Sequence, residues 1–265
     1  MASEIRVDTV YNESGDSDSG LDMSTNDVVA VKIAGSEKVR VHSDGRLAVG
    51  TASPSHALHV DSGSTDGVAL FESSGDANAY VVMKDSGSSD GAFIGAVGTS
   101  TVLGTGGSTV RMTIDSSGHV TMPYQTAFYA HKNGTDQDNF STGSYQTVTW
   151  SHEQYDVNGD FASNTFTAPV TGKYLLCLNI RLHNVDTAAN YYIGGFLTSN
   201  QRYNSLFDPD GLSTDATYWT IAISALAEMD ANDTATVVVY QSGGSAQTDI
   251  GGSNEYTWFS GCLLC

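Results

Sequence analysis

The chain has 265 residues, of which 40% are hydrophobic, and that length suits one large domain or two modest ones. Lys and Arg number 11 against 30 Asp and Glu, and the resulting net charge of −19 argues against nucleic-acid binding, which needs a basic face. No apolar run approaches the roughly 18 residues of a membrane span, so we expect no membrane insertion.

Residues 1–123 contain short apolar runs separated by turns rich in Gly, Ser and Asp. Asp44-Gly45 between two alternating runs predicts a β-hairpin, and Ser117-Gly118 marks a second hairpin of the same kind. In chain order the predicted strands are 5–10, 28–33, 39–41, 47–49, 57–60, 68–71, 80–83, 93–97, 112–114 and 120–122. Such short runs bury little apolar area in one chain. We therefore expect several copies to wrap around one axis as an extended, intertwined, β-rich shaft, with a flexible tether as the alternative.

From Tyr124 onward aromatic residues are frequent and the predicted strands lengthen. Residues 173–182, 191–197, 218–226, 236–240 and 256–264 are largely apolar or alternating, and the segment has no long helical period. This pattern predicts an all-β sandwich or jelly roll. The cysteines at 177, 262 and 265 are expected to be reduced thiols in packed strands rather than metal ligands, because a second ligand pair is missing.

Four segments of the second half resemble a known superfamily. Residues 166–174 read FTAPVTGKY, which resembles the F-x-A-P-x-x-G-x-Y motif of the C1q/tumour-necrosis-factor superfamily. Residues 155–161 stand where that superfamily has an Asn/Gly-rich turn before the motif. Residues 223–233 resemble its turn motif, with Ala231-Asn232 where Gly is commoner, and residues 257–264 are similar to its terminal F-S-G-x-L-L strand. The resemblance covers 124–265 and implies a ten-strand jelly-roll sandwich that assembles as a homotrimer.

Two segments of the first half resemble a known repeat. Residues 43–54 read SDGRLAVGTASP and are followed by ALHV at 57–60, while residues 111–120 read RMTIDSSGHV. Both segments are similar to the repeats of bacteriophage tail fibres. The resemblance implies a structural virion fibre, without enzymatic activity, that mediates host attachment. Residues 1–48 would anchor to other virion proteins, 49–123 would form the trimeric shaft, and 124–265 would be the tip that contacts a host cell-surface glycan or protein.

Localisation follows from the same resemblance. The opening residues lack an apolar run, so we expect no signal peptide and assembly in the bacterial host cytoplasm before incorporation into the virion. Two alternatives stay open, namely a capsid or collar decorating fibre without a receptor role, and a tip that depolymerises a polysaccharide.

Six residues near a predicted turn are candidates for receptor binding. They combine aromatic faces with polar groups, which suits a sugar or protein surface, although the aromatic rings could instead fill the core. These residues are Arg202, Tyr203, Phe207, Asp208, Asp210 and Tyr218.

Asp156, Asn158 and Asp160 supply three oxygen ligands at alternate positions, an arrangement that suits calcium. A twelve-residue calcium loop that begins at Asp156 would end on Thr167 instead of an acid, so the alternative is a hydrogen-bonded turn. Residues 87–91 match Gly-x-Ser-x-Gly by letter, but a predicted strand follows where the catalytic elbow requires a helix. Beyond possible calcium, no cofactor is expected.

Overall fold

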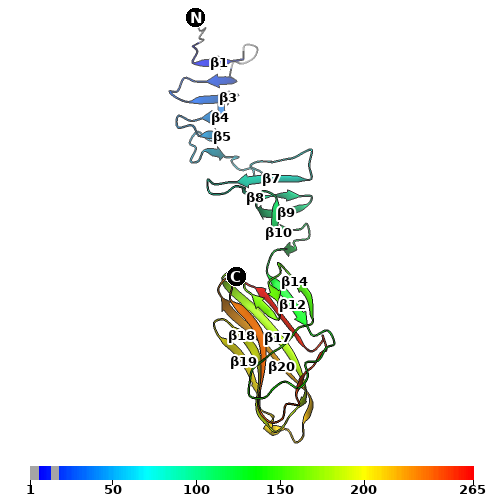
Figure 1. The fold of residues 1–265 in the computed structure, drawn as a ribbon. Coiled ribbons are helices and arrows are strands. Elements are labelled where there is room, and N and C mark those ends of the chain that lie inside the picture. Colours follow the sequence, from blue (N-terminus) through cyan, green and yellow to red (C-terminus); the bar gives the residue numbers. More distant parts are fainter. Residues whose placement is uncertain (1–5, 13–17) are drawn as a thin grey trace. The chain divides into compact units, whose positions relative to one another are not determined.

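The computed structural model describes residues 6–12 and 18–265, and these residues are almost entirely in β-strands and turns (Figure 1). Parts of the expected anchor, residues 1–5 and 13–17, lie outside the described residues. The one helix among the described residues is the short 3-10 helix η1 (Pro209–Gly211), and no helix there could cross a membrane. The all-β prediction is confirmed. The chain divides into two compact units, the first of which runs to Val81 and includes Gly95–Gly98.

The first sheet contains six short strands in chain order, β1 to β6. Neighbouring strands are antiparallel except for β5 and β6, which are parallel. The hairpin predicted at Asp44-Gly45 joins β4 to β5, and Gly45 has a φ of +83°, a conformation that favours glycine. The strands are β1 (Thr9–Tyr11), β2 (Gly20–Asp22), β3 (Val29–Ile33), β4 (Ser36–Val41), β5 (Leu47–Val49) and β6 (Leu58–Val60).

The strand register places aliphatic side chains on one face of this sheet. Residues directly opposite each other in a sheet share a face, and the Val and Leu positions of neighbouring strands are opposite each other. Ile33, at the end of β3, is the exception and is opposite Ser36. We call this surface the aliphatic face. Its members are Val10, Leu21, Val29, Val31, Val39, Val41, Leu47, Val49, Leu58 and Val60. Most of them are about half exposed; Val41, for example, is 44% exposed.

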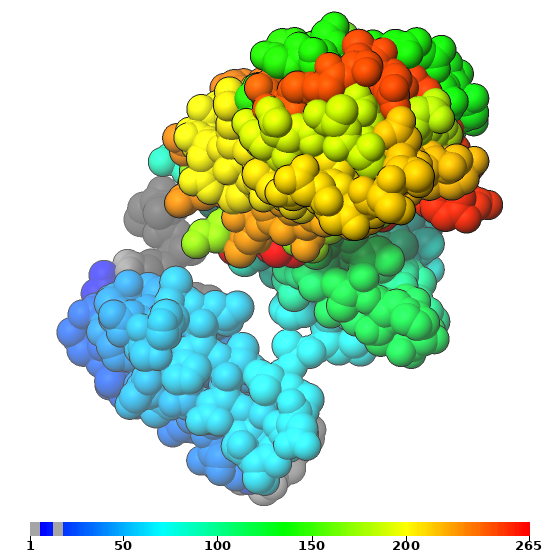
Figure 2. Space-filling model, turned by 90° about the horizontal axis from the view of Figure 1, so that it is seen from below, coloured from blue at the N-terminus to red at the C-terminus, as the bar shows by residue number. Residues whose placement is uncertain are grey.

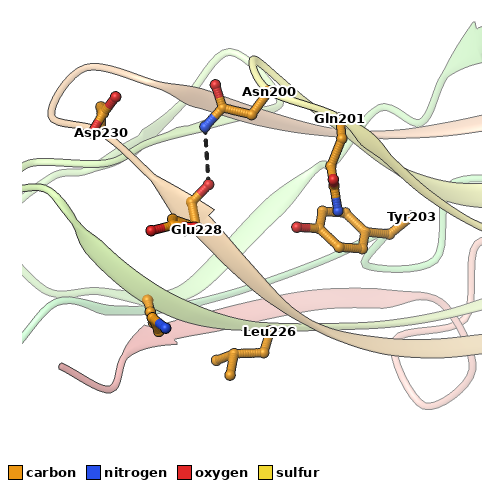
Figure 3. A pocket seen from close by; sticks show the side chains of 7 residues that line it. Asn200, Gln201, Tyr203, Leu226, Glu228 and Asp230 are labelled. Atoms are coloured by element: carbon orange, nitrogen blue, oxygen red, sulfur yellow. Dashed lines mark hydrogen bonds between the residues drawn. The ribbon is translucent and has the colours of Figure 1, made fainter.

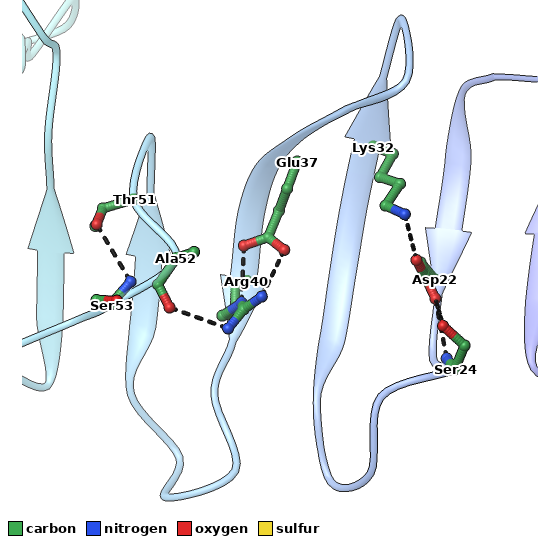
Figure 4. A network of polar contacts seen from close by, with 8 residues as sticks. All are labelled: Asp22, Ser24, Lys32, Glu37, Arg40, Thr51, Ala52 and Ser53. Atoms are coloured by element: carbon green, nitrogen blue, oxygen red, sulfur yellow. Dashed lines mark hydrogen bonds and ion pairs between the residues drawn. The ribbon is translucent and has the colours of Figure 1, made fainter.

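The opposite face of the first sheet is polar (Figure 4). Arg40 donates two hydrogen bonds of 2.7 Å to the carboxylate of Glu37, and Lys32 forms an ion pair with Asp22. Hydrogen bonding from Lys32 holds the pKa of Asp22 well below its ordinary value. Arg40 is paired in register with Ala30 and Ala48, whose small size leaves room for its long side chain.

The second sheet contains five strands in the order β11-β10-β9-β8-β7. The hairpin predicted at Ser117-Gly118 is present, since Ile114 of β10 faces Val120 of β11. Phe93 and Val102 are buried here, and Phe93 lies against Gly104, where a β-carbon would be 2.0 Å from its ring. The strands are β7 (Asn78–Met83), β8 (Ala92–Val97), β9 (Ser100–Thr105), β10 (Thr109–Ile114) and β11 (Val120–Thr121).

Two sequence predictions in this region are wrong. Residues 68–71 form no strand, and Leu70 and Phe71 are 84% and 68% exposed, because no neighbouring strand hydrogen-bonds to them. Conversely, β9 is not predicted from the sequence, because Gly104 weakens the strand pattern although it makes room for the ring of Phe93.

Residues from β12 onward form a sandwich of two antiparallel sheets with jelly-roll strand order. One sheet, here the outer sheet, has the order β14-β12-β23-β17-β20, and the other has the order β15-β16-β21-β18-β19. The strands of the whole sandwich are β12 (Ala127–His131), β13 (Gln146–Thr147), β14 (His152–Asp156), β15 (Phe161–Ala162), β16 (Thr165–Thr167), β17 (Gly172–Val185), β18 (Ala189–Thr198), β19 (Arg202–Phe207), β20 (Ala216–Met229), β21 (Thr234–Gly243), β22 (Asp249–Ile250) and β23 (Trp258–Leu263). The sandwich therefore has two strands more than the ten expected, because β13 and β22 pair at its sides.

The hydrophobic core of the chain lies between these two sheets. Phe259 is fully buried, and its ring lies 4.8 Å from that of Phe128 and 5.5 Å from that of Phe196. Gly261 is required beside it, because a β-carbon there would be 2.7 Å from the Phe128 ring. At one end of the sandwich, shown in Figure 2, the segment after β17 (yellow-green) lies beside the segment that follows β19 (gold), and the Thr187 amide donates to Asp215.

The motif residues of the terminal and FTAPVTGKY segments are mostly core residues. Phe166, Ala168 and Tyr174 are fully buried, and the Tyr174 hydroxyl donates a 2.6 Å hydrogen bond to the Val170 carbonyl. Asn232 stands where glycine is commoner and has a φ of +74°, which asparagine tolerates better than most residues. The departure from the motif therefore keeps the same turn.

Lys132 is the one lysine among the described residues that the fold buries, with 1% of its surface exposed. Its ammonium donates to the Thr149 hydroxyl, and burial lowers its pKa. Because a lowered lysine pKa means that the folded state binds protons less readily, the charge destabilises the fold at neutral pH, and stability increases as the pH rises. We expect Lys132→Met to raise the free energy of unfolding by about 1 kcal/mol at pH 7 and by less at about pH 9.

Denaturant unfolding at the two pH values measures this effect. The exposed Lys173→Met is the control and should change stability by less than about 0.5 kcal/mol. A Lys132→Met protein less stable than the original at both pH values would contradict the prediction.

Candidate binding site at the open edge of the sandwich

The two sheets of the sandwich end side by side in strands β19 and β20, which form its open edge. Along β19 the side chains alternate, so that Arg202 and Leu206 are exposed while Tyr203 and Phe207 pack against the core. Side chains from both strands and from the turns at their ends are therefore accessible along this edge.

The structure separates the six residues predicted to bind a receptor. Arg202 lies at the first residue of β19 with its guanidinium over Tyr145, at 4.5 Å from the ring centre. Phe207 lies at the last residue, about 17 Å away at 3.3–3.4 Å per strand residue. Tyr218 is 60% exposed and lies on the outer face of β20, beside His183. The six residues therefore do not share one surface.

Two of the predicted positions have structural roles. Phe207 stacks on Trp219 with ring centres 3.7 Å apart, so it closes the edge between the two sheets. The Asp208 carboxylate accepts a 2.9 Å hydrogen bond from the Asp210 amide and caps η1. The alternative interpretation, in which the aromatic residues fill the core, holds for Phe207.

Tyr203 does line a pocket, at the end of the edge where β19 begins and β20 ends (Figure 3). The pocket has a volume of about 500 Å³ and is mainly polar, with Leu226 as its apolar wall. Its lining residues come from β17, the β18–β19 turn, β19 and β20, and the turn after β20. They are Lys173, Asn200, Gln201, Tyr203, Leu226, Glu228 and Asp230. We call this the edge pocket.

Hydrogen bonds fix one wall of the edge pocket. The Asn200 side-chain amide donates to the Glu228 carbonyl at 3.0 Å (Figure 3). It also donates to the Asp233 carboxylate at 2.9 Å. Lys173 and Glu228 are register partners on β17 and β20, so their side chains lie next to each other. Carboxylate, amide, ammonium and phenol groups around an apolar wall suit a polyhydroxylated ligand, which offers both donors and acceptors.

Among these pocket residues only Tyr203 is predicted from the sequence. The others lie at 173, 200–201 and 226–230, and the β17–β20 register together with the β18–β19 turn brings them together. No local motif marks them, because each is an ordinary surface residue of its own strand or turn.

The acidic turn at 156–160 is held by its own hydrogen bonds. The two Asp156 oxygens accept from the amides of Asp160 and Phe161, each at 3.0 Å, and the Asn158 side chain donates to the Tyr124 carbonyl. Burial raises the pKa of Asp160 above its ordinary value. Among the described residues no group of three or more His, Cys, Asp or Glu is arranged to hold a metal. A calcium site that also uses the Asn158 side chain would not be such a group. Calcium binding by Asp156, Asn158 and Asp160 therefore stays a prediction.

The outer face of the outer sheet carries a band without charged side chains. The rings of Tyr155, Tyr129 and Trp258 follow one another across β14, β12 and β23, with successive centres 6.1 Å and 5.9 Å apart. Beside Trp258 the small residues Ala222 and Ser224 of β20 leave a groove of about 310 Å³. We call these rings and the groove the aromatic band. Cys177 lies in it as a free thiol, and Cys262 and Cys265 are free as well.

No family model and no curated relative matches the sequence. Among solved structures, the chain is similar to the globular domain of a zebrafish complement 1qA protein, with 15% identity over 53% of this chain and 98% of that one and a TM-score of 0.38. Crystal structures of murine APRIL are similar at 12% identity, over 53% of this chain and 99% of theirs, with TM-scores of 0.38 and 0.39. At these values the similarity carries no information about what this chain binds.

Substitutions separate the structural from the accessible positions of the predicted receptor set. Phe207→Ala removes the stacked ring beside Trp219 and should lower the free energy of unfolding by about 3 kcal/mol. Asp210→Ala, at an exposed position of η1, should change it by less than about 0.5 kcal/mol. Urea unfolding of the two variants measures both values, and equal effects would contradict the assignment of Phe207 to the core.

Proposed function

We propose that this chain is the subunit of a homotrimeric bacteriophage fibre that attaches the virion to its host through the jelly-roll sandwich. In this proposal residues 1–48 begin the anchor, 49–123 form the shaft and 124–265 form the tip. The boundary at 48 falls within β5, so an anchor that folds as a unit includes β5 and β6.

The aliphatic face of the first sheet is the observation that carries the proposal. A Val or Leu side chain that goes from half exposed to buried contributes on the order of 1 kcal/mol, so covering the whole face would contribute several kcal/mol per chain. Among the described strand residues of the first sheet only Ala30 and Ala48 are buried apolar residues, together with Val28 just before β3. Other copies are the partner that every chain meets during assembly, and they present the same face.

The second sheet and the sandwich support the same assembly. Leu103 and Val120 lie on one face of the second sheet and are 40% and 52% exposed. In the sandwich, the aromatic band combines aromatic rings with an absence of charge, which is the composition of the centre of a protein interface. We assign the band to contact between the sandwiches of neighbouring copies.

The edge pocket is the receptor site of the proposed tip. Three pockets per fibre, and several fibres per particle, convert weak binding of one surface glycan into firm attachment. The net charge of −19 means that binding is not driven by attraction to an anionic cell surface. The neutral and mixed-charge lining of the pocket suits hydroxyl groups, which bind by hydrogen bonds instead.

A charge on the aliphatic face tests the assembly. Val41 is already 44% exposed in a single chain, so Val41→Glu would be tolerated by a monomer but would bury a carboxylate in a trimer, at a cost of several kcal/mol. We expect light scattering to give three times 27.9 kDa for the original chain and a smaller mass for Val41→Glu. Ser43→Glu, at an exposed position of the turn between β4 and β5 and off the aliphatic face, is the control and should stay trimeric. A monomeric original chain would overturn the proposal.

Competition with virions tests attachment. Purified full-length protein should block adsorption of the virion to host cells, and the block should change by less than about threefold between about 50 mM and 500 mM NaCl. Glu228→Gln in the edge pocket should weaken the block, whereas Glu255→Gln, an exposed acid outside the pocket, should not. A steep dependence on salt, or equal effects of the two variants, would contradict the pocket as the receptor site.

A further inference from the structure

Arg181 stands out among the charged residues of the sandwich. After Lys132 the chain contains only three cations, Lys173, Arg181 and Arg202. None of the three forms an ion pair with a carboxylate that the structure describes, although the protein has 30 acidic residues. Arg181 differs from the other two because it lies over two tyrosine rings. It also contacts a histidine.

Two tyrosine rings flank the Arg181 guanidinium. Its central carbon lies 4.4 Å from the ring centre of Tyr256 and 5.1 Å from that of Tyr218. Tyr218 comes from β20 and Tyr256 from the segment before β23, where the Asn179 side chain donates a 2.7 Å hydrogen bond to its carbonyl. Both tyrosines are exposed, at 60% and 45%, so this end of the outer sheet is accessible to a ligand.

His183 fixes the direction in which the guanidinium points. The Arg181 Nε donates a 3.0 Å hydrogen bond to His183 Nε2. Because a guanidinium can only donate, Nε2 must be the acceptor and Nδ1 carries the proton, which faces the Asp136 carboxylate at 3.7 Å. Gly251 allows this position, since a β-carbon there would be 2.3 Å from Nε2.

The terminal nitrogens of Arg181 are available to donate hydrogen bonds to a ligand. Only Nε donates a side-chain hydrogen bond to the part of the chain that the structure describes, so Nη1 and Nη2 keep their donors. A planar pair of donors matches a carboxylate, which can accept both bonds at once. The flanking tyrosines add ring faces, against which a sugar can pack, and hydroxyl groups that can hydrogen-bond to it.

We propose that Arg181, Tyr218 and Tyr256 form a second binding site, which takes a carboxylate-bearing sugar residue of a surface polysaccharide. This site specifies the class of sugar that the proposed fibre tip would bind, so the inference rests on the proposed attachment function. The acidic chain repels polyanions at long range, so one such site is weak, and three copies in a trimer provide the affinity.

Glycan binding by the full-length protein tests this site. The probes are an oligosaccharide of hexuronic acids, the same oligosaccharide with its carboxyl groups reduced to alcohols, and a phosphorylated oligosaccharide of equal length. We expect binding to the uronate and a loss of at least about tenfold on the reduced form. Preference for the phosphorylated probe over the uronate would overturn the carboxylate assignment.

Variants of Arg181 distinguish recognition by its planar pair of donors from attraction by its positive charge alone. Arg181→Gln should weaken uronate binding by about tenfold or more, and Arg181→Lys, which keeps the charge but loses the planar pair of donors, should weaken it by about fivefold or more. The matched control is Arg202→Gln, which removes another cation that lies over a tyrosine, and it should change binding by less than about twofold. Equal losses for Arg181→Gln and Arg202→Gln would overturn the proposal.

Light scattering on the same samples distinguishes this inference from the proposed function. A trimer that blocks virion adsorption but binds no uronate contradicts the Arg181 site alone. A monomer contradicts the fibre, whatever it binds. A fall in mass on Arg181→Gln would mean that neighbouring copies cover Arg181, and it would overturn the glycan site.

Discussion

The aliphatic face of the first sheet sets the main constraint on this protein. A sheet one layer thick cannot bury an apolar face by itself, and the strand register collects Val and Leu from all six strands on that face. The opposite face carries ion pairs over small alanines, so the sheet has a solvent side and a side that needs a partner. The trimer proposal follows from this asymmetry.

The sandwich, in contrast, buries the apolar faces of its two sheets within one chain. Its two sheets cover each other, and Phe128, Phe196 and Phe259 fill the space between them. Because the core is complete, the outer surfaces of the sandwich are not needed for its own stability and are available for contacts. The aromatic band, the edge pocket and the Arg181 site occupy different parts of that surface.

Strand geometry makes these surfaces suitable for recognition. The edge pocket is built from side chains of β17, β19 and β20 with an amide held by two hydrogen bonds. Arg181 is held by His183 of its own strand and lies by Tyr218 of β20. Groups on hydrogen-bonded strands lose little conformational freedom on binding, which favours affinity for small ligands. The two sites lie toward opposite ends of β17, because Lys173 is the second residue of the strand and Arg181 lies nearer its other end.

Local chemistry was predictable from the sequence. Alternation and turn residues identified both hairpins of the first half, because Asp44-Gly45 and Ser117-Gly118 act within a few residues. The motif with Phe166 and Tyr174 predicted the sandwich, since its members are core residues whose size and spacing the fold requires. The strand expected at 68–71 failed, because an apolar run becomes a strand only where a neighbouring strand accepts its hydrogen bonds.

The sites needed the tertiary structure. Six residues close together in sequence were expected to form one surface, but alternation along β19 turned Phe207 inward and Arg202 outward, and Tyr218 went to another face. The edge pocket and the Arg181 site bring together residues that are tens of positions apart along the chain. Composition and local pattern determined that the chain is all-β, acidic and built of short strands before longer ones, because these properties depend on near neighbours. Only strand register decided which side chains share a surface, because pairing across a sheet joins residues whatever their separation in sequence.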